Sequence, residues 1–135
     1  MSISGSYDIL VSEYAKKHFI KSFQKKYKVA WDQTFDTIND MLCRIDNFLL
    51  SSKAEKIHIC DKWYIAKCEF KIAWSNESAK TSGNRIIIYV DEMKYEVQIL
   101  LIYCKTDISW NNETAWRWSE IKQNHKDVAK LFIWL

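Results

Sequence analysis

Four basic side chains in the second half of the chain are the residues best suited to chemistry. They are Lys71, Lys80, Arg85 and Lys105. Lysine and arginine carry fixed positive charge, so several of them around one point bind a phosphate or another oxyanion and stabilise negative charge that develops there. Neither Arg85 nor Lys105 has an acidic residue within two positions, except Asp107 after Lys105. The pattern therefore indicates phosphate chemistry, if the fold brings these side chains together.

Hairpin connectivity predicts that it does. Alternating apolar residues indicate a strand at 63–73, a polar loop at 75–84, and strands at 85–90 and 96–104. In antiparallel neighbours the end of one strand lies beside the start of the next, so the ends of the first and third strands meet the start of the second. We expect the four cations at that end of the sheet.

The same residues allow a plainer interpretation, which stays open at this point. Lys67 and Lys71 would be ordinary side chains on a solvated face of the sheet, opposite a packed face. Arg85 would pair with Glu69 across the sheet, so that its charge would not be available to a ligand.

The elements that must position these residues follow from the hydrophobic periodicity. The further predictions are a strand Tyr7–Val11, a helix from Ser12, a helix Trp31–Leu50, a strand Lys56–Cys60, and a helix from about Glu113 capped by Asn111 or Asn112. This order predicts an α+β fold, in which two N-terminal helices and a C-terminal helix pack on one face of a twisted antiparallel sheet of four to five strands. The apolar ending 131–135 should dock on the core or bind a partner.

The first predicted helix carries an unusual number of lysines opposite its apolar stripe. A solvated helix face is the ordinary explanation, but this many cations on one short helix exceeds what solubility requires, and a phosphate backbone is the commonest partner of such a stripe. An acidic protein would also serve. The lysines assigned to RNA or ribosome binding are Lys16, Lys17, Lys21 and Lys25 on this helix, together with Lys67 and Lys71.

Length and composition bound the class of protein. The chain has 135 residues, 48% of them hydrophobic, and a formal net charge of +3. These values predict one folded domain over residues 1–135 and exclude an intrinsically disordered chain. Cys43, Cys60, Cys68 and Cys104 form no CxxC pair, so neither a metal site nor a cofactor is expected. With no signal-peptide layout and no membrane-spanning run, we expect a cytoplasmic protein with no membrane partner.

Two neighbouring blocks of the sequence are similar to a known family. The block from Lys80 to Val90 (KTSGNRIIIYV) and the strand from Ile99 to Lys105 (ILLIYCK) resemble bacterial type II toxins of the RelE/ParE superfamily, particularly the HigB-like branch. The resemblance covers roughly residues 7–108 and includes the lysine-rich first helix. It implies a RelE-like microbial ribonuclease fold, with residues 110–135 as a C-terminal helical extension that has no counterpart in the family.

The resemblance also implies an activity and partners. The expected function is that of a toxin that acts as an mRNA endonuclease in the ribosome and is neutralised by a small cognate antitoxin, which is expected to be of the helix-turn-helix type. Such enzymes use no metal, because the 2′-hydroxyl of the RNA attacks the adjacent phosphate and leaves a cyclic phosphate. The protein removes a proton, stabilises the extra negative charge and protonates the leaving oxygen.

Site residues carry over position by position. Arg85 matches the family's arginine after the glycine, which stabilises the transition state. Lys80 and Lys105 match basic positions that bind phosphate, and either could be a general base where neighbouring cations favour its neutral form. Tyr103 or Tyr89 could supply a phenol for proton transfer or a ring for base stacking.

The chain also departs from the family. Thr106 stands where many members carry a second basic residue, and Trp116 and Trp118 occupy the last helix in place of a tyrosine or histidine. Trp110, Trp116 or Trp118 could stack on a base, although packing of the last helix is the more usual role. Two other functions remain: a ParE-like inhibitor of DNA gyrase, against which the basic cluster counts, and a non-catalytic RNA- or protein-binding module that uses the lysine stripe.

Overall fold

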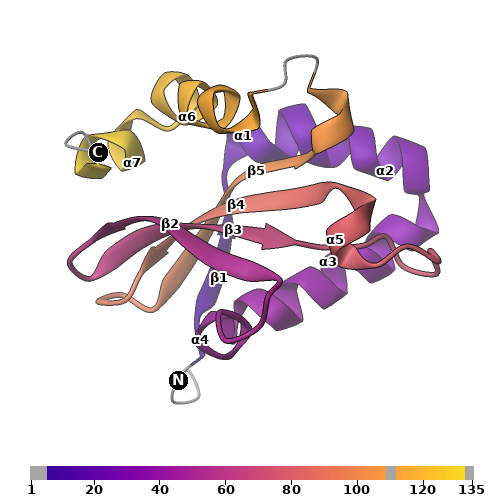
Figure 1. The fold of residues 1–135 in the computed structure, drawn as a ribbon, viewed down its shortest axis with the longest axis horizontal. Coiled ribbons are helices and arrows are strands. Elements are labelled where there is room, and N and C mark those ends of the chain that lie inside the picture. The colour runs from indigo at the N-terminus through magenta and orange to yellow at the C-terminus, as the bar shows by residue number, and fades with distance from the viewer. Residues whose placement is uncertain (1–5, 109–111, 133–135) are drawn as a thin grey trace.

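A five-stranded sheet forms the centre of the molecule (Figure 1). The computed structural model describes residues 6–108 and 112–132. The strands are β1 (Asp8–Val11), β2 (Ala54–Cys60), β3 (Trp63–Glu69), β4 (Asn84–Asp91) and β5 (Glu96–Cys104), in the spatial order β1-β5-β4-β3-β2. β2 to β5 form the predicted antiparallel meander.

The direction of β1 corrects the prediction of an antiparallel sheet. β1 pairs parallel to β5, so the sheet is mixed. A tight hairpin forces its two strands to run antiparallel, whereas a long connection allows the parallel direction. The chain between β1 and β5 passes through the helices and three further strands, and no hairpin links the two.

The predicted helix Trp31–Leu50 is two helices in the structure. They are α3 (Val29–Leu42) and α4 (Ile45–Phe48). The helix is interrupted where the carbonyl of Cys43 accepts a hydrogen bond from the backbone N–H of Tyr7, at 2.9 Å, rather than from the next turn. The N-terminal chain thus replaces the helical hydrogen bond at this point.

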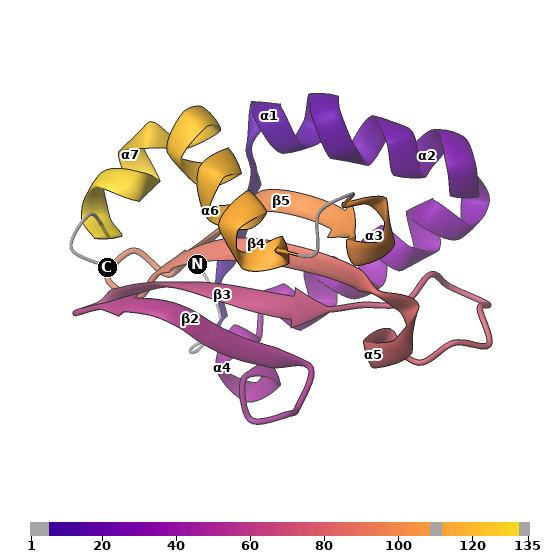
Figure 2. The same cartoon turned by 45° about the horizontal axis from the view of Figure 1, so that its top comes forward.

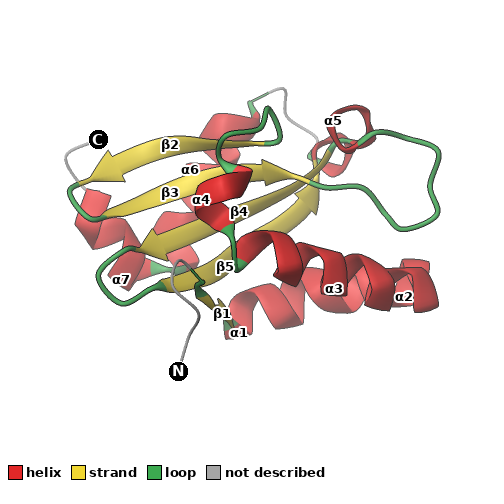
Figure 3. Ribbon diagram, turned by 90° about the horizontal axis from the view of Figure 1, so that it is seen from below, coloured by secondary structure: helices red, strands yellow, loops and turns green. Residues whose placement is uncertain are grey.

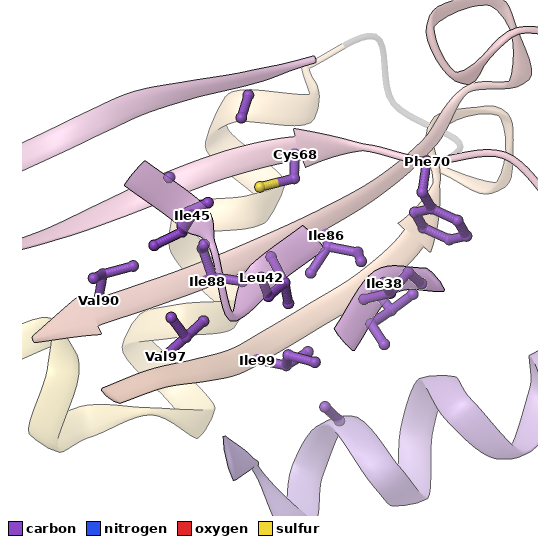
Figure 4. Packing of buried hydrophobic residues seen from close by; sticks show 14 of the residues in the cluster. Ile38, Leu42, Ile45, Cys68, Phe70, Ile86, Ile88, Val90, Val97 and Ile99 are labelled. Atoms are coloured by element: carbon purple, nitrogen blue, oxygen red, sulfur yellow. The ribbon is translucent and has the colours of Figure 1, made fainter. Parts of the chain in front are cut away.

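One face of the sheet carries the larger apolar core. Ile38 and Leu42 of α3 and Ile45 of α4 are fully buried against β3, β4 and β5 (Figure 4). Their spacing of four and three residues is the one that predicted a packed helix. This part of the core follows directly from the sequence pattern.

The first helix contains a π-helical turn that shifts its buried stripe. It consists of α1 (Glu13–Ala15), the π-helical turn η1 (Lys16–Ile20) and α2 (Lys21–Tyr27). The side chain of Ser12 caps it by accepting the N–H of Ala15, at 3.0 Å. A π-turn inserts one residue, so Ile20 is buried where a regular stripe predicts Phe19, which is half-buried.

The opposite face is covered as well, which corrects the prediction of a solvated face and of helices on one side only. Above it lie α6 (Glu113–Asn124), α7 (Lys126–Ala129) and the 3₁₀ turn η3 (Lys130–Phe132), whereas α4 lies below the sheet (Figure 2). Ile65, Ile87 and Leu101 point to this face and are fully buried with Phe132. These helices fall within the predicted extension 110–135. Phe132 docks on the core, and residues 133–135 of the apolar ending lie outside the described residues.

An irregularity in β5 fastens the C-terminal helices to the sheet. Ile87 pairs with Leu101 but Ile88 pairs with Ile99, so Leu100 is the extra residue of a β-bulge. The His125 ring Nε2 lies 2.9 Å from the carbonyl oxygen of Leu100. The hydrogen bond therefore uses the backbone group of the residue that the bulge leaves unpaired.

The third strand is shorter than predicted. β3 ends at Glu69 rather than at residue 73, and a loop leads from it to the short helix α5 (Ala79–Ser82) within the predicted polar loop.

Asn112 caps α6 by accepting the N–H of Ala115, at 3.0 Å. Among the helices of the described ranges, none is both long and apolar enough to cross a membrane.

Candidate functional site

The end of the sheet where β3 stops, β4 begins and β5 stops gathers the segments that the hairpin connectivity predicts. Arg85 pairs in register with Glu69 on one side and with Tyr103 on the other. The backbone N–H of Lys105 donates to the carbonyl of Gly83, at 2.8 Å. Alternation along the strands places the side chains of Glu69, Arg85 and Tyr103 on the face that α6 covers.

Arg85 is not the uncompensated cation that was expected. Its side chain is 6% exposed, and its Nη2 lies 3.2 Å from Oε2 of Glu69, which is 12% exposed. Its Nη1 donates to the carbonyl of Asn84, at 3.0 Å. An unpaired charge costs several kcal/mol when buried, so a carboxylate directly opposite in the ladder becomes its partner. The structure thus confirms the plainer interpretation, in which Arg85 pairs with Glu69 across the sheet.

One nitrogen of this guanidinium has no partner. The buried Nε of Arg85 makes no hydrogen bond within the part of the chain that the structure describes. The Nε–H is therefore a donor that neither Glu69 nor Asn84 uses.

Tyr103 is also buried and held by a carboxylate. Its side chain lies beside Arg85 in the ladder, and its hydroxyl donates to Oε2 of Glu113 on α6. Arg117, one helical turn later, places its Nη1 3.3 Å from the same oxygen. Burial, and then the hydrogen bond to Glu113, raise the pKa of Tyr103. The phenol is a neutral donor in this arrangement, with its proton committed to Glu113.

Three of the four predicted cations are exposed. Lys80 is on α5, Lys105 follows β5, and Lys71 lies beyond the end of β3. Gly83 ends α5 with a φ of +80°, and a Cβ there would lie 3.3 Å from Cγ of Lys105. The glycine thus allows the stem of Lys105 to pass close to the C-terminal end of α5.

The other predicted lysines fall on two separate surfaces. Lys67 is half-buried in β3, and its Nζ lies 3.1 Å from Oε1 of Glu55 on β2, which neutralises its charge. The lysines of the first helix are exposed: Lys16, Lys17, Lys21 and Lys25. Only a weak, exposed contact of 3.6 Å links one of them, Lys16, to Glu13. The helix therefore presents these positive charges to solvent.

The aromatic residues of the last helix pack on the protein. The Trp116 ring lies 4.8 Å from the Tyr103 ring, and the Trp118 ring lies 5.0 Å from that of His58. Tyr89 packs against Phe132, with ring centroids 6.3 Å apart. The packing role expected for two of the tryptophans is the one observed, and Trp110 lies outside the described residues.

Two histidines lie among these contacts, of which His125 is buried and His58 is half-buried. Burial lowers the pKa of His58, and the nearby charge of Arg117 lowers it further. Burial also lowers the pKa of His125, although its hydrogen bond to Leu100 acts in the opposite direction. Both rings therefore favour the neutral form under the C-terminal helices.

The sequence interpretation missed the two α6 side chains that complete this site. Glu113 and Arg117 are four residues apart, which is the spacing of an ion pair on one helix face. That spacing signals a pair but does not reveal that its carboxylate also binds Tyr103. Within residues 6–108 and 112–132, no group of three His, Cys, Asp or Glu side chains is placed to hold a metal ion.

Comparison with known proteins supports the fold. No protein-family model and no curated protein matches the chain. Among solved structures, a chain of the crystal structure of the archaeal RelE–RelB complex from Pyrococcus horikoshii OT3 superposes with a TM-score of 0.54 at 13% identity, over 76% of this chain and 99% of that chain. The likeness shows a RelE-like fold, as the resemblance implies.

Proposed function

We propose that this chain is the toxin of a type II toxin–antitoxin system and that it arrests translation by cutting mRNA in the ribosome. The observation that carries the proposal is a RelE-like fold whose sheet end bears exposed lysines on both sides of a buried arginine. The solved structure that superposes on this chain is a RelE–RelB complex, which supports a cognate antitoxin as its partner. The HigB-like branch and a helix-turn-helix antitoxin remain part of the proposal.

In the proposed reaction the RNA supplies its own nucleophile. The 2′-oxygen forms a bond to phosphorus, the bond from phosphorus to the 5′-oxygen breaks, and a 2′,3′-cyclic phosphate results. The 2′-hydroxyl loses one proton and the 5′-oxygen gains one, so no metal or other reactant is required. Lys80 and Lys105 bind the scissile phosphate, because their exposed charges need no rearrangement to receive it.

Arg85 contributes only if the phosphate replaces Glu69. Carboxylate and phosphate both match the planar fork of a guanidinium, so one can exchange for the other. The unpartnered Nε supplies an additional donor for the incoming anion. Tyr103 is subject to the same condition, since its proton reaches the substrate only when Glu113 releases it.

These two carboxylates favour a second candidate function. With Arg85 paired to Glu69 and Tyr103 bonded to Glu113, the sheet end could bind RNA through its lysines without cutting it. The chain would then arrest translation by occupying the ribosome. The lysines of the first helix, Lys16, Lys17, Lys21 and Lys25, serve ribosome binding in either case.

Controlled expression of the chain in bacteria tests the proposal. We expect protein synthesis to stop, transcripts to acquire new 5′ ends at ribosome-occupied codons, and the double variant Arg85→Ala, Lys105→Ala to restore growth. Lys94→Ala, in the β4–β5 turn at the other end of the sheet, is the matched control and should stay toxic. Arrest with intact transcripts supports the binding function, whereas DNA breakage with intact transcripts supports gyrase inhibition.

A further inference from the structure

The loop between β3 and α5 carries a large aromatic side chain that the fold does not use. Trp74 is 73% exposed, although tryptophan is among the residues that contribute most to a core when buried. Figure 3 shows this loop, residues 70–78, projecting from the end of the sheet near α5. An exposed tryptophan on a projecting loop is available to a ligand.

The backbone at Trp74 adopts a strained, left-handed conformation. The N–H of Ser75 donates to the carbonyl of Ile72, at 3.1 Å, which closes a four-residue turn, and Trp74 is its third residue with a φ of +66°. The position corresponds to the one in a type II turn that favours glycine, because a Cβ is crowded there. Neither local preference nor core packing accounts for a tryptophan at this position.

The loop is also anchored, so the tryptophan stands on an ordered base. The N–H of Ala73 donates to Oγ1 of Thr34 on α3, at 2.8 Å, and that hydroxyl in turn donates to the carbonyl of Ala30, at 2.6 Å. The N–H of Glu77 donates to Oγ of Ser75, at 3.1 Å. A ligand that stacks on Trp74 would have little backbone freedom left to restrict.

A pocket of about 380 Å³ lies between this loop and α3. Its apolar lining includes Ile38, Met41 and Phe70, and two lysines, Lys53 and Lys71, also line it. Glu69 also lines the pocket, but its carboxylate is on the other face of the sheet, where it pairs with Arg85.

The charges beside Trp74 indicate what would stack on it. Nζ of Lys71 lies 3.5 Å from the carbonyl of Ser75, so an ammonium group stands next to the residue that follows the tryptophan. An aromatic face combined with neighbouring cations is how proteins bind unpaired nucleotides, whose bases stack and whose phosphates pair with lysine. A protein partner would favour further exposed apolar side chains, but Ser75, Asn76 and Glu77 are polar.

We propose that Trp74 stacks on an unpaired base of the RNA substrate, with Lys71 and Lys53 on the adjoining phosphates. The inference rests on the proposed function, because it requires that the protein binds RNA. It adds an RNA contact outside the lysines of the sheet end, and it places the strand beyond the scissile phosphate across the loop and the pocket.

Binding of a fluorescein-labelled, single-stranded 12-nucleotide RNA to the full chain, followed by anisotropy, tests the inference. We expect Trp74→Ala to weaken binding about tenfold, as loss of one stacked base does, and Trp74→Phe to retain most of the affinity. The control is Tyr95→Ala, because Tyr95 is also exposed (49%), has a φ of +53° and lies in the β4–β5 turn. It should bind like the parent.

A second probe separates stacking from charge. An RNA backbone of the same length without bases should bind the parent and Trp74→Ala with equal affinity. The variant Lys71→Ala should bind both probes more weakly than the parent does. Trp74→Gly, which relieves the positive φ, should keep or raise the melting temperature while losing affinity, and so exclude unfolding as the cause.

The outcomes distinguish this inference from the proposed function. If the parent binds RNA and Trp74→Ala binds it equally, stacking is wrong and the proposed function stands. If the parent binds neither probe, the inference is overturned, whereas the proposed function is decided separately by the expression experiment, because it requires contact with mRNA in the ribosome. If Trp74→Ala loses toxicity in cells at unchanged RNA affinity, Trp74 contacts a protein and the inference is overturned.

Discussion

The two faces of the sheet are covered in different ways. Under α3 and α4 the contacts are those of an apolar core, with Ile38, Leu42 and Ile45 fully buried. Under α6 and α7 an apolar centre borders an ion pair, a tyrosine–carboxylate bond and a histidine bonded to a β-bulge. The first face depends mainly on apolar burial, with a tyrosine–carboxylate bond from Tyr7 to Asp46 of α4, whereas the second combines a buried ion pair, a tyrosine–carboxylate bond and a bonded histidine.

The difference indicates where the molecule is built for chemistry. Buried polar groups are stable only with their partners, so a face that contains them is more sensitive to pH and to competing anions than an apolar one. Arg85 and Tyr103, for which the resemblance implies catalytic roles, both lie on the sensitive face, held by carboxylates. A ligand that binds Arg85 or Tyr103 in place of its carboxylate partner would change the contacts of this face and leave those of the other face intact.

The largest expected effect is on the apolar face. Trp31 is 1% exposed and stacks on Phe23, with ring centroids 4.8 Å apart. Trp31→Ala removes a fully packed ring and should lower the free energy of unfolding by about 4 kcal/mol. Urea unfolding measures this change in the free energy of unfolding. The control is Val29→Ala, because Val29 is exposed on the same helix and the variant should change stability by less than about 0.5 kcal/mol.

The buried ion pair should come next. Glu69→Gln leaves the buried charge of Arg85 without a carboxylate and should cost about 3 kcal/mol. Glu55→Gln breaks the more exposed pair with Lys67 and should cost less than about 1 kcal/mol. Equal effects of the two variants would contradict the claim that burial makes the Arg85–Glu69 pair the more costly one to break.

A smaller effect is expected from the tyrosine–carboxylate bond. Tyr103→Phe removes the donor to Glu113 but leaves Arg117 beside it, and should cost about 1–2 kcal/mol. Tyr89→Phe is the matched control, because the Tyr89 hydroxyl makes no hydrogen bond among the described residues. If both variants unfold at the same urea concentration, the Tyr103 bond does not help to hold α6.

The smallest effect is the dependence on pH. His58 and His125 have lowered pKa values in the folded state, so below about pH 6.5 the unfolded chain binds protons that the folded chain does not. Stability should therefore fall gradually as the pH falls from 7 to 5. Thermal unfolding of the double variant His58→Gln, His125→Gln should lose most of this slope, and that of His18→Gln, an exposed histidine, should keep it.

Much of the fold could be predicted from the sequence, because periodic burial leaves a periodic pattern. The seam of Trp31, Ile38, Leu42 and Ile45 and the apolar runs of β4 and β5 identified the helices and strands that form the apolar face. The break at Cys43 could not be predicted, since it depends on a hydrogen bond from Tyr7, far away in the sequence. The cover of the second face was also missed, because the polar residues of α6 conceal which side of that helix is buried.

The location of the site could be predicted from the sequence, but the partners of its charged and polar side chains were predicted less well. Strand connectivity alone brings Arg85, Tyr103 and Lys105 to one sheet end. The cross-strand partner Glu69 was foreseen only as an alternative, because nearness in the ladder does not decide whether a cation faces solvent or a carboxylate. Glu113 lies on α6, and no local sequence pattern fixes where this helix packs on the sheet. Its bond to Tyr103 could therefore not be predicted.

We propose that the exposed lysines and Arg85 at the sheet end cut RNA on the ribosome. Incubation of the purified chain with ribosomes that translate a defined mRNA, followed by primer extension and analysis of the cleaved ends, tests this proposal. We expect new 5′ ends and a 2′,3′-cyclic phosphate without added metal, and we expect both to be lost in the Arg85→Ala, Lys105→Ala variant and kept in Lys94→Ala. Intact mRNA on ribosomes that hold the bound protein would contradict it and leave a toxin that acts by binding alone.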